Sequence, residues 1–343
     1  MKRALVAVAV AVLALACASS ALATKPGSGS SVGPARVFAP NPVEDLGDQS
    51  LTDRKDADYP ALQGAYRTVQ LTNLDGSGFL RGDWAEIVGE TGNPAYSPTN
   101  TFLYDRGQDE FEQVMAYYWI TEAQKYIQSL GFRTGGPLRP VNEEPQRLRI
   151  NQWGIDNSFA TTHKDEIRLG KGGVDDAEDA EVILHEYGHA IHFAQGFEFS
   201  SVEAGAISEG FGDYWAVTVG QHVRARLGLP PSADPACVAD WDAVSYTTTV
   251  PHCLRRVDRD LSYPDDLVDQ VHADGRIWSR ALWEIRLAIG SERADTVVLE
   301  GQFGFDGGTM PALAERIVEA AADLYDAGVA GQVEAAFASR GIL

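Results

Sequence analysis

Three histidines and a glutamate lie within eight residues of this sequence, in the segment HEYGHAIH at positions 185–192. His185 and His189 are four residues apart, so a helix would place both imidazoles on one face. Glu186 would project about 100° further around that helix, beside an ion held by the histidines but not bonded to it. This H-E-x-x-H spacing supplies two metal ligands and a general base, and neutral imidazole suits zinc. We therefore predict a zinc site at His185 and His189.

A catalytic zinc takes a third protein ligand and leaves one position for water. The metzincin pattern would require Gly at 192 and His at 195, but the sequence has His192 and Gln195. The gluzincin pattern requires a Glu on the next helix and an Asp four residues later, which Glu209 and Asp213 provide in the segment AISEGFGDYW. Twenty residues separate His189 from Glu209 (209 − 189), enough to end one helix and begin another. Asp213 would then accept the second N–H of a ligating imidazole, that of His185.

With these motifs the sequence resembles the thermolysin-like and fungalysin-like zinc metallopeptidases, most densely over residues 156–283. The resemblance implies that Asn157 and Ser158 hold the substrate backbone from an edge strand. It implies that Val182 and Leu254 line the pocket for the residue after the scissile bond, which would favour an apolar residue there. Arg255, in the segment CLRR, would bind a substrate carbonyl, and His272, in VHADGRIW, would stabilise the tetrahedral intermediate.

Three departures from the family pattern stand out. A tyrosine that helps to hold the oxyanion in the family is replaced here by Ser200, so that either another aromatic residue enters the site or one donor is missing. The aspartate that orients the oxyanion histidine falls at Leu267, with Asp266 and Asp269 nearby. Family members usually carry a large propeptide, whereas only residues 24–36 are left for one here.

These residues support hydrolysis of peptide bonds in peptide or protein substrates. A zinc ion held by His185, His189 and Glu209 would polarise water and the scissile carbonyl, and Glu186 would move the proton to the leaving amine. We expect a zinc endopeptidase. Two alternatives remain: a catalytically weak or inactive binding protein that keeps the zinc scaffold, and a zinc exopeptidase, although no motif for a free amino terminus is evident.

The elements that must position these residues follow from periodicity and turn residues. Residues 65–88 alternate like a strand pair around the turn DGSG, and residues 147–154 and 165–173 also indicate strands. Helices are predicted at residues 107–132, 175–196, 201–221, 271–290, 310–328 and 332–339. The fold class is therefore α+β, with a mixed sheet-plus-helix lobe at residues 37–196, a mainly helical lobe at residues 197–343, and the zinc cleft between them.

The N-terminus and the cysteines predict a secreted protein. Residues 1–23 have the basic start, short apolar run and small-x-small site of a signal peptide, followed by a Gly-, Ser- and Pro-rich tether at residues 24–36. Lipid attachment at Cys17 is the alternative, but the residues before it fit a lipoprotein signal poorly. After signal removal, Cys237 and Cys253 remain and predict one disulfide.

The net charge of −21 argues against a nucleic acid or an anionic membrane as a partner. The mature chain is expected to be a monomer. The segment DDAEDAE is most simply a solvated helix start, but Asp175, Asp176, Asp179 and Glu181 could alternatively contribute to a calcium site. His192 is expected to be structural because the ligand set is complete without it.

Overall fold

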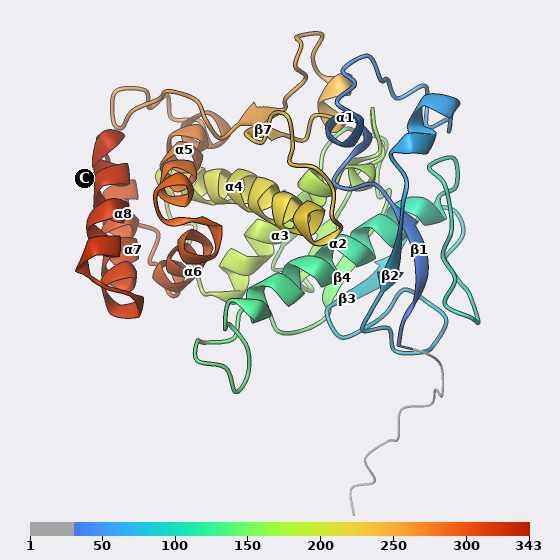
Figure 1. The fold of residues 1–343 in the computed structure, drawn as a ribbon, viewed down its shortest axis with the longest axis horizontal. Coiled ribbons are helices and arrows are strands. Elements are labelled where there is room, and N and C mark those ends of the chain that lie inside the picture. The colour runs from blue at the N-terminus through green and yellow to red at the C-terminus, as the bar shows by residue number, and fades with distance from the viewer. Residues whose placement is uncertain (1–30) are drawn as a thin grey trace, which may run out of the picture.

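The computed structural model describes residues 31–343. The signal peptide predicted at residues 1–23 lies outside the described residues. The chain is α+β, as predicted: most strands lie in its first half and most helices in its second half, and a large hydrophobic core runs through both. Figure 1 shows α5–α8 gathered at the C-terminal side, the first strands on the opposite side, and α3 and α4 between them.

Two small sheets and one mixed sheet make up the strand layer. Strands β1 and β2 pair antiparallel, and β7 and β8 form a short antiparallel pair. The mixed sheet has the order β3-β4-β6-β5, in which β3, β4 and β6 are parallel and β5 is an antiparallel edge strand. The strands are β1 (Gly33–Val37), β2 (Arg67–Leu71), β3 (Ala85–Gly89), β4 (Gln146–Arg149), β5 (Phe159–Thr161), β6 (Glu166–Arg168), β7 (Cys237–Val238) and β8 (Arg255–Arg256).

The two helices that cross at the centre of the fold, α3 and α4, are mostly buried. Helices α3 and α4 cross closely, and α5 packs against α4 on the other side. The helices are α1 (Pro42–Leu46), α2 (Glu110–Ser129), α3 (Ala180–Ala194), α4 (Val202–Arg226), α5 (Val271–Ile289), α6 (Ser291–Gln302), α7 (Met310–Leu324) and α8 (Ala327–Ser339), with short 3-10 turns at Pro60–Gly64, Asp176–Glu178 and Asp242–Ser245. Helix α6 was not predicted from the sequence.

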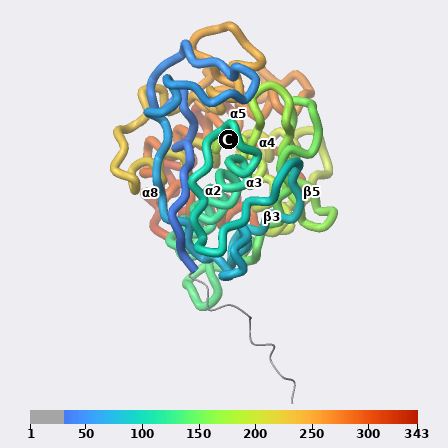
Figure 2. The backbone as a smooth tube through the Cα atoms, turned by 90° about the vertical axis from the view of Figure 1, so that its right-hand side faces the viewer, coloured from blue at the N-terminus to red at the C-terminus, as the bar shows by residue number. Residues whose placement is uncertain are grey.

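Two sequence predictions about the N-terminal part are wrong. The strands on either side of the DGSG turn do not pair with each other: β2 pairs with β1, and β3 pairs with β4. Across the turn itself there is an isolated antiparallel bridge between Leu74 and Gly82. The tether was predicted to reach residue 36, but the chain is already a strand from Gly33, and β1 runs beside α2 in both views (Figures 1 and 2). In each case long-range pairing, which local patterns do not encode, decides the partner.

The start of α3 also differs from the prediction. The helix begins at Ala180, with Asp179 as its N-cap, and the preceding acidic residues form a 3-10 turn. None of the carboxylates in DDAEDAE is solvated, since each is at most 2% exposed. Of the four residues considered for calcium, Asp176 alone belongs to a group of carboxylates whose oxygens lie within 4.8 Å of one another, together with Asp156 and Asp242. The others have other partners: Asp175 pairs with Lys171, Asp179 accepts backbone N–H groups of Trp241 and Asp242, and Glu181 accepts the N–H of Ala239.

Candidate metal centre and catalytic pocket

The three predicted ligands meet at one point, although they come from two helices. His185 and His189 lie one turn apart on α3, and Glu209 lies in the first half of α4. Nε2 of His185 is 3.3 Å from Oε2 of Glu209, and Nε2 of His189 is 3.6 Å from Oε1. One donor atom from each residue lies within 4.8 Å of the other two, so a single ion could be bound by all three. Neutral nitrogen donors with one carboxylate are a set that zinc prefers.

Two glycines allow the helices to approach closely enough for this convergence. A Cβ atom placed on Gly188 would lie 2.9 Å from Cα of Gly212, and one on Gly212 would lie 2.7 Å from Nδ1 of His185. Such distances are shorter than van der Waals contact, so any side chain at these positions would push α3 and α4 apart. Gly188 and Gly212 lie close to the ligands in the sequence, but it is the crossing of α3 and α4 that shows why a side chain is not tolerated there.

Asp213 holds the far side of the His185 ring. Nδ1 of His185 is 2.9 Å from Oδ1 of Asp213, and Arg255 donates to both oxygens of the same carboxylate at 2.7 Å. This arrangement leaves Nε2 of His185 directed at the metal position. Arg255, which the resemblance assigns to a substrate carbonyl, thus has two of its N–H groups committed to Asp213.

The charges around the ligands favour a bound cation. Burial would raise the pKa of Glu209, but the hydrogen bond from His185 and the neighbouring histidines outweigh it and hold that pKa well below the usual range. Burial likewise opposes protonation of His185, yet its hydrogen bonds to Asp213 and Glu209 raise its pKa to about 10, whereas burial lowers the pKa of His189 to about 4. Asp213 and Glu209 favour the protonated form of His185. A divalent ion bound at Nε2 would replace that proton.

A serine that the sequence analysis did not identify positions His189. The hydroxyl of Ser208 is 2.7 Å from Nδ1 of His189 and 2.9 Å from Nδ1 of His192. If Nδ1–H of His189 donates to Ser208, the serine hydroxyl donates to His192, and Nε2 of His189 is free for a metal. His192 is fully buried and stacked between Phe197 and Phe211, so it is structural and not a ligand.

Glu186 lies beside the ligands without pairing with them. It lines the same cavity, is 7% exposed, and its Oε2 has no hydrogen-bond partner. Burial raises its pKa to about 7, partly offset by the charge of His185. A carboxylate with such a pKa can both accept and return a proton near neutral pH.

His272 approaches the site from the N-terminus of α5. Its Nε2 is 3.4 Å from Oε2 of Glu209, and its Nδ1 is 3.0 Å from Nε2 of Gln270. Gln270 is the N-cap of α5 and uses its Oε1 to accept the N–H of Ala273, so its amide N–H₂ must face His272. Nδ1 of His272 is therefore an acceptor, and the ring presents Nε2–H to the cavity. The orienting partner is Gln270 and not the expected aspartate near position 267.

Ser200, which stands where the resembled family has a tyrosine, does not replace that tyrosine in the cavity. Ser200 lies away from the cavity and donates to the carbonyl of Gly307. Among the described residues that line the cavity, Tyr246 is the sole tyrosine, and its hydroxyl donates to Asp156. The other aromatic residues of the described chain that line the cavity, apart from histidines, have no hydroxyl group: they are Phe159, Phe193 and Phe199.

The residues assigned to the substrate share one cavity with the metal ligands. Its volume is about 320 Å³, and it is lined by residues of both halves of the chain. Asn157 and Ser158 directly precede the edge strand β5, Val182 lies one turn before His185 on α3, and Leu254 and His272 close the opposite side. The sequence analysis named Asp176 only as a possible calcium ligand and missed Asp242, Phe193, Phe199 and Tyr246, all of which also line the cavity.

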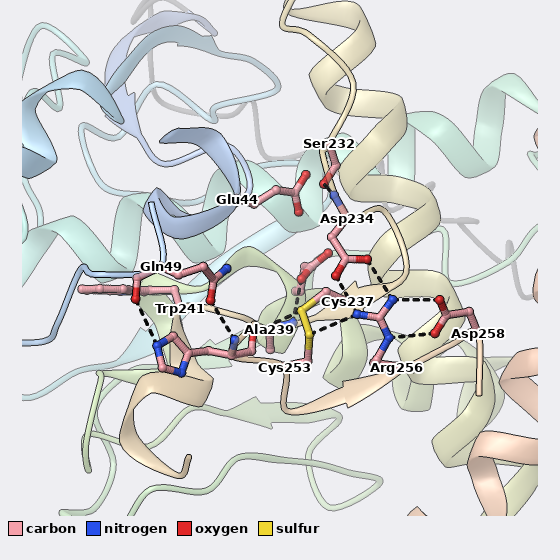
Figure 3. The surroundings of a disulfide bond; sticks show 12 residues. Glu44, Gln49, Ser232, Asp234, Cys237, Ala239, Trp241, Cys253, Arg256 and Asp258 are labelled. Carbon is pink, nitrogen blue, oxygen red and sulfur yellow. Dashed lines mark hydrogen bonds and ion pairs between the residues drawn. A yellow bond between two sulfur atoms is a disulfide. The ribbon is translucent and has the colours of Figure 1, made fainter. Parts of the chain in front are cut away.

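The predicted disulfide is present. Cys237 at the start of β7 is bonded to Cys253, just before β8, and the two Cα atoms are 5.3 Å apart. Figure 3 shows Arg256 beside the disulfide, between the carboxylates of Asp234 and Asp258. The bridge closes the loop that carries Asp242 and Tyr246, and thus it fixes one wall of the cavity.

No model of a known protein family matches this sequence, and no curated protein sequence matches it. Comparison with solved structures gives a different result. The fold is similar to that of a protealysin precursor. That protein, a metalloproteinase from Serratia proteamaculans, superposes with a TM-score of 0.53 and 17% sequence identity, over 76% of this chain and 88% of the other. At this identity the likeness establishes the fold, and the chemistry has to be argued from the residues.

Proposed function

We propose that this chain is a secreted zinc-dependent endopeptidase. The observation that carries the proposal is the convergence of His185, His189 and Glu209 at a cavity that Glu186 also lines. The donor set fits zinc, and the buried carboxylate of Glu209, whose oxygens lie 3.3 and 3.6 Å from Nε2 of His185 and His189, is the kind of group that a cation would satisfy. The protealysin precursor with the similar fold is itself described as a metalloproteinase.

The chain's own residues would perform the proton transfers and hold the substrate. Zinc in this site would supply Lewis-acid activation of water and of the scissile carbonyl. Glu186 accepts the proton of the attacking water and passes it to the leaving amine. Nε2–H of His272 donates to the developing oxyanion. The substrate backbone would extend along β5 at Asn157 and Ser158. Val182 and Leu254 give the adjoining pocket apolar walls, which supports a preference for an apolar residue just after the cut.

The disulfide supports secretion, because such bonds persist in oxidising compartments. No helix among residues 31–343 is long and apolar enough to cross a membrane.

Hydrolysis of casein and of amino-blocked peptides tests the proposal. Cleavage within blocked peptides is expected, with loss on chelation and recovery with zinc, and Glu186→Gln should abolish cleavage while retaining one zinc per chain by metal analysis. Cleavage of free but not of blocked peptides would instead indicate an exopeptidase.

A zinc-bearing binding protein is the second candidate. The missing hydroxyl donor favours it, since Ser200 faces Gly307 and the hydroxyl of Tyr246 is bonded to Asp156. A zinc-loaded wild-type protein that leaves a broad peptide library intact would decide for this candidate.

A further inference from the structure

The cavity beside the metal ligands has an acidic floor. Of the residues that line it, Phe199, Tyr246 and His272 are exposed or partly exposed and form its rim. Asp176 and Asp242 also line the cavity and are 2% and 3% exposed; we call this buried pair its acidic floor. Val182 and Leu254 lie on the walls. The cavity therefore combines apolar side chains with buried carboxyl groups.

The floor carboxylates lack the partners that buried carboxylates need. Oδ1 of Asp176 and Oδ1 of Asp242 are buried without a hydrogen-bond partner, whereas Oδ2 of Asp176 accepts from Ser158. Asp156 brings a third carboxylate, and oxygen atoms of all three lie within 4.8 Å of one another. An unpaired charge in a buried site is costly, so this arrangement calls for a cation.

The surrounding charges do not supply that cation. The strongest charge effects on Asp242 come from Asp176, Asp156 and Asp179, and Arg255, which opposes them, already forms a bidentate pair with Asp213. Burial raises the pKa of Asp242 well above its usual range, and that of Asp176 to about 7. Burial is the main cause of both shifts, so a cation placed beside these carboxyl groups would lower both pKa values.

We propose that this cavity is a subsite for a basic substrate side chain, in which Val182 and Leu254 contact the methylene stem and Asp176 and Asp242 pair with the cationic end. Lysine and arginine have such an apolar stem and charged end, and arginine can donate to two carboxylates at once. The inference rests on the proposed peptidase function and refines the apolar preference expected from the walls alone. The enzyme would cut before arginine or lysine.

Paired peptide substrates test the subsite. Arginine after the scissile bond is compared with citrulline, which has nearly the same shape and no charge. The wild type is expected to cleave the arginine peptide with a kcat/KM about tenfold or more above the citrulline peptide, because a desolvated charge pair is being formed. Equal rates for the two peptides would overturn the proposal.

Substitutions of Asp176 and Asp242 test whether these two carboxyl groups cause the arginine preference. Asp242→Asn and Asp176→Asn should each reduce the arginine-to-citrulline ratio about tenfold, with folding checked by thermal melting and zinc content. Asp175→Asn is the matched control, because Asp175 is equally buried, pairs with Lys171 and does not line the cavity. A ratio that falls equally in the control, or in no variant, would contradict the assignment.

Two further measurements separate the remaining outcomes. Calcium added to the zinc-loaded enzyme should leave the arginine-to-citrulline ratio unchanged. The proposal would be overturned if calcium bound, removed the arginine preference, and no longer bound to Asp242→Asn. The carboxylates would then hold a calcium ion. If the wild type cleaves no peptide, the peptidase function fails, and the subsite is then tested by binding of acetyl-arginine amide and acetyl-citrulline amide to Glu186→Gln. Tighter binding of the arginine compound supports the subsite, and equal binding refutes it.

Discussion

The imidazole of His185 lies directly against the backbone of Gly212 on the neighbouring helix. The space is so restricted that a Cβ atom on Gly212 would lie 2.7 Å from Nδ1 and 2.9 Å from Cε1 of the ring. The same ring nitrogen contacts Asp213, the next residue along α4. The position of one predicted ligand thus depends on the absence of a side chain at a residue that has no chemistry of its own.

Gly212→Ala should displace the His185 ring and damage the metal centre. We expect kcat/KM to fall about 100-fold, since misplacement by about 1 Å can have such an effect. The zinc dissociation constant and peptide hydrolysis measure it. Gly331→Ala is the control, because a Cβ there meets no atom within 4 Å. Full activity of Gly212→Ala would show that α3 and α4 can separate without consequence.

Ser208→Ala should weaken zinc binding without removing a ligand. The serine hydroxyl orients His189, and loss of such a partner typically reduces metal affinity about 10–100-fold. Competition with a chelating dye gives the dissociation constant. Ser279→Ala makes the same change at another buried helical serine, whose hydroxyl bonds only the carbonyl of Arg276. Equal zinc affinities of Ser208→Ala and the wild type would remove Ser208 from the metal centre.

His272→Ala should lower kcat about 100- to 1,000-fold while zinc remains bound, as expected for loss of an oxyanion donor. Substrate affinity should change less, because the donor acts mainly on the charge that develops during reaction. Steady-state kinetics on one blocked peptide separate the two effects. His163→Ala, at an exposed loop histidine, is the control. A variant altered only in KM would make His272 a binding residue.

The ion pairs of Glu166 should make the free energy of unfolding depend on pH. Hydrogen bonds from Arg149 lower its pKa to about 2, against the opposing effect of burial and with help from Arg168. Because the folded pKa lies below the unfolded value, the stabilisation is present above about pH 4.5 and is lost as the pH falls towards about 2.

Urea unfolding of the wild type and Glu166→Gln at several pH values checks this window. The wild type should be more stable near neutral pH, and its advantage should shrink below pH 4.5. Glu334→Gln, an exposed change on α8, serves as the reference. A difference between wild type and Glu166→Gln that stays constant with pH would exclude the ion pairs as its cause.

The Cys237–Cys253 bridge should stabilise the folded chain. Its cysteines are 16 residues apart, and a loop of this size is worth about 2–3 kcal/mol through restriction of the unfolded state. The double variant Cys237→Ser, Cys253→Ser should lose that amount in denaturant unfolding and become insensitive to reductant. Wild-type stability that is unchanged by reduction would mean that the loop is held by other contacts, such as Arg256 with Asp234 and Asp258.

The sequence by itself determined the elements whose signals are local. Helical periodicity and the four-residue spacing of His185 and His189 follow from neighbouring residues, as do the general position of Glu186 and the helices around residues 110–129 and 271–289. The even cysteine count after signal removal predicted the disulfide. These features need no knowledge of the rest of the chain, because their periods and spacings are properties of single elements.

Only the tertiary structure decided what meets at long range. The partners of β2 and β3, the burial of the acidic segment before α3, and the use of Gln270 to orient His272 all depend on residues distant in sequence or on the turn that a cap imposes. The same holds for the acidic floor, where Asp176 and Asp242 are 66 positions apart (242 − 176) yet line one cavity. Burial turns such carboxylates from ordinary surface charges into groups that require a partner, and burial is a property of the whole fold.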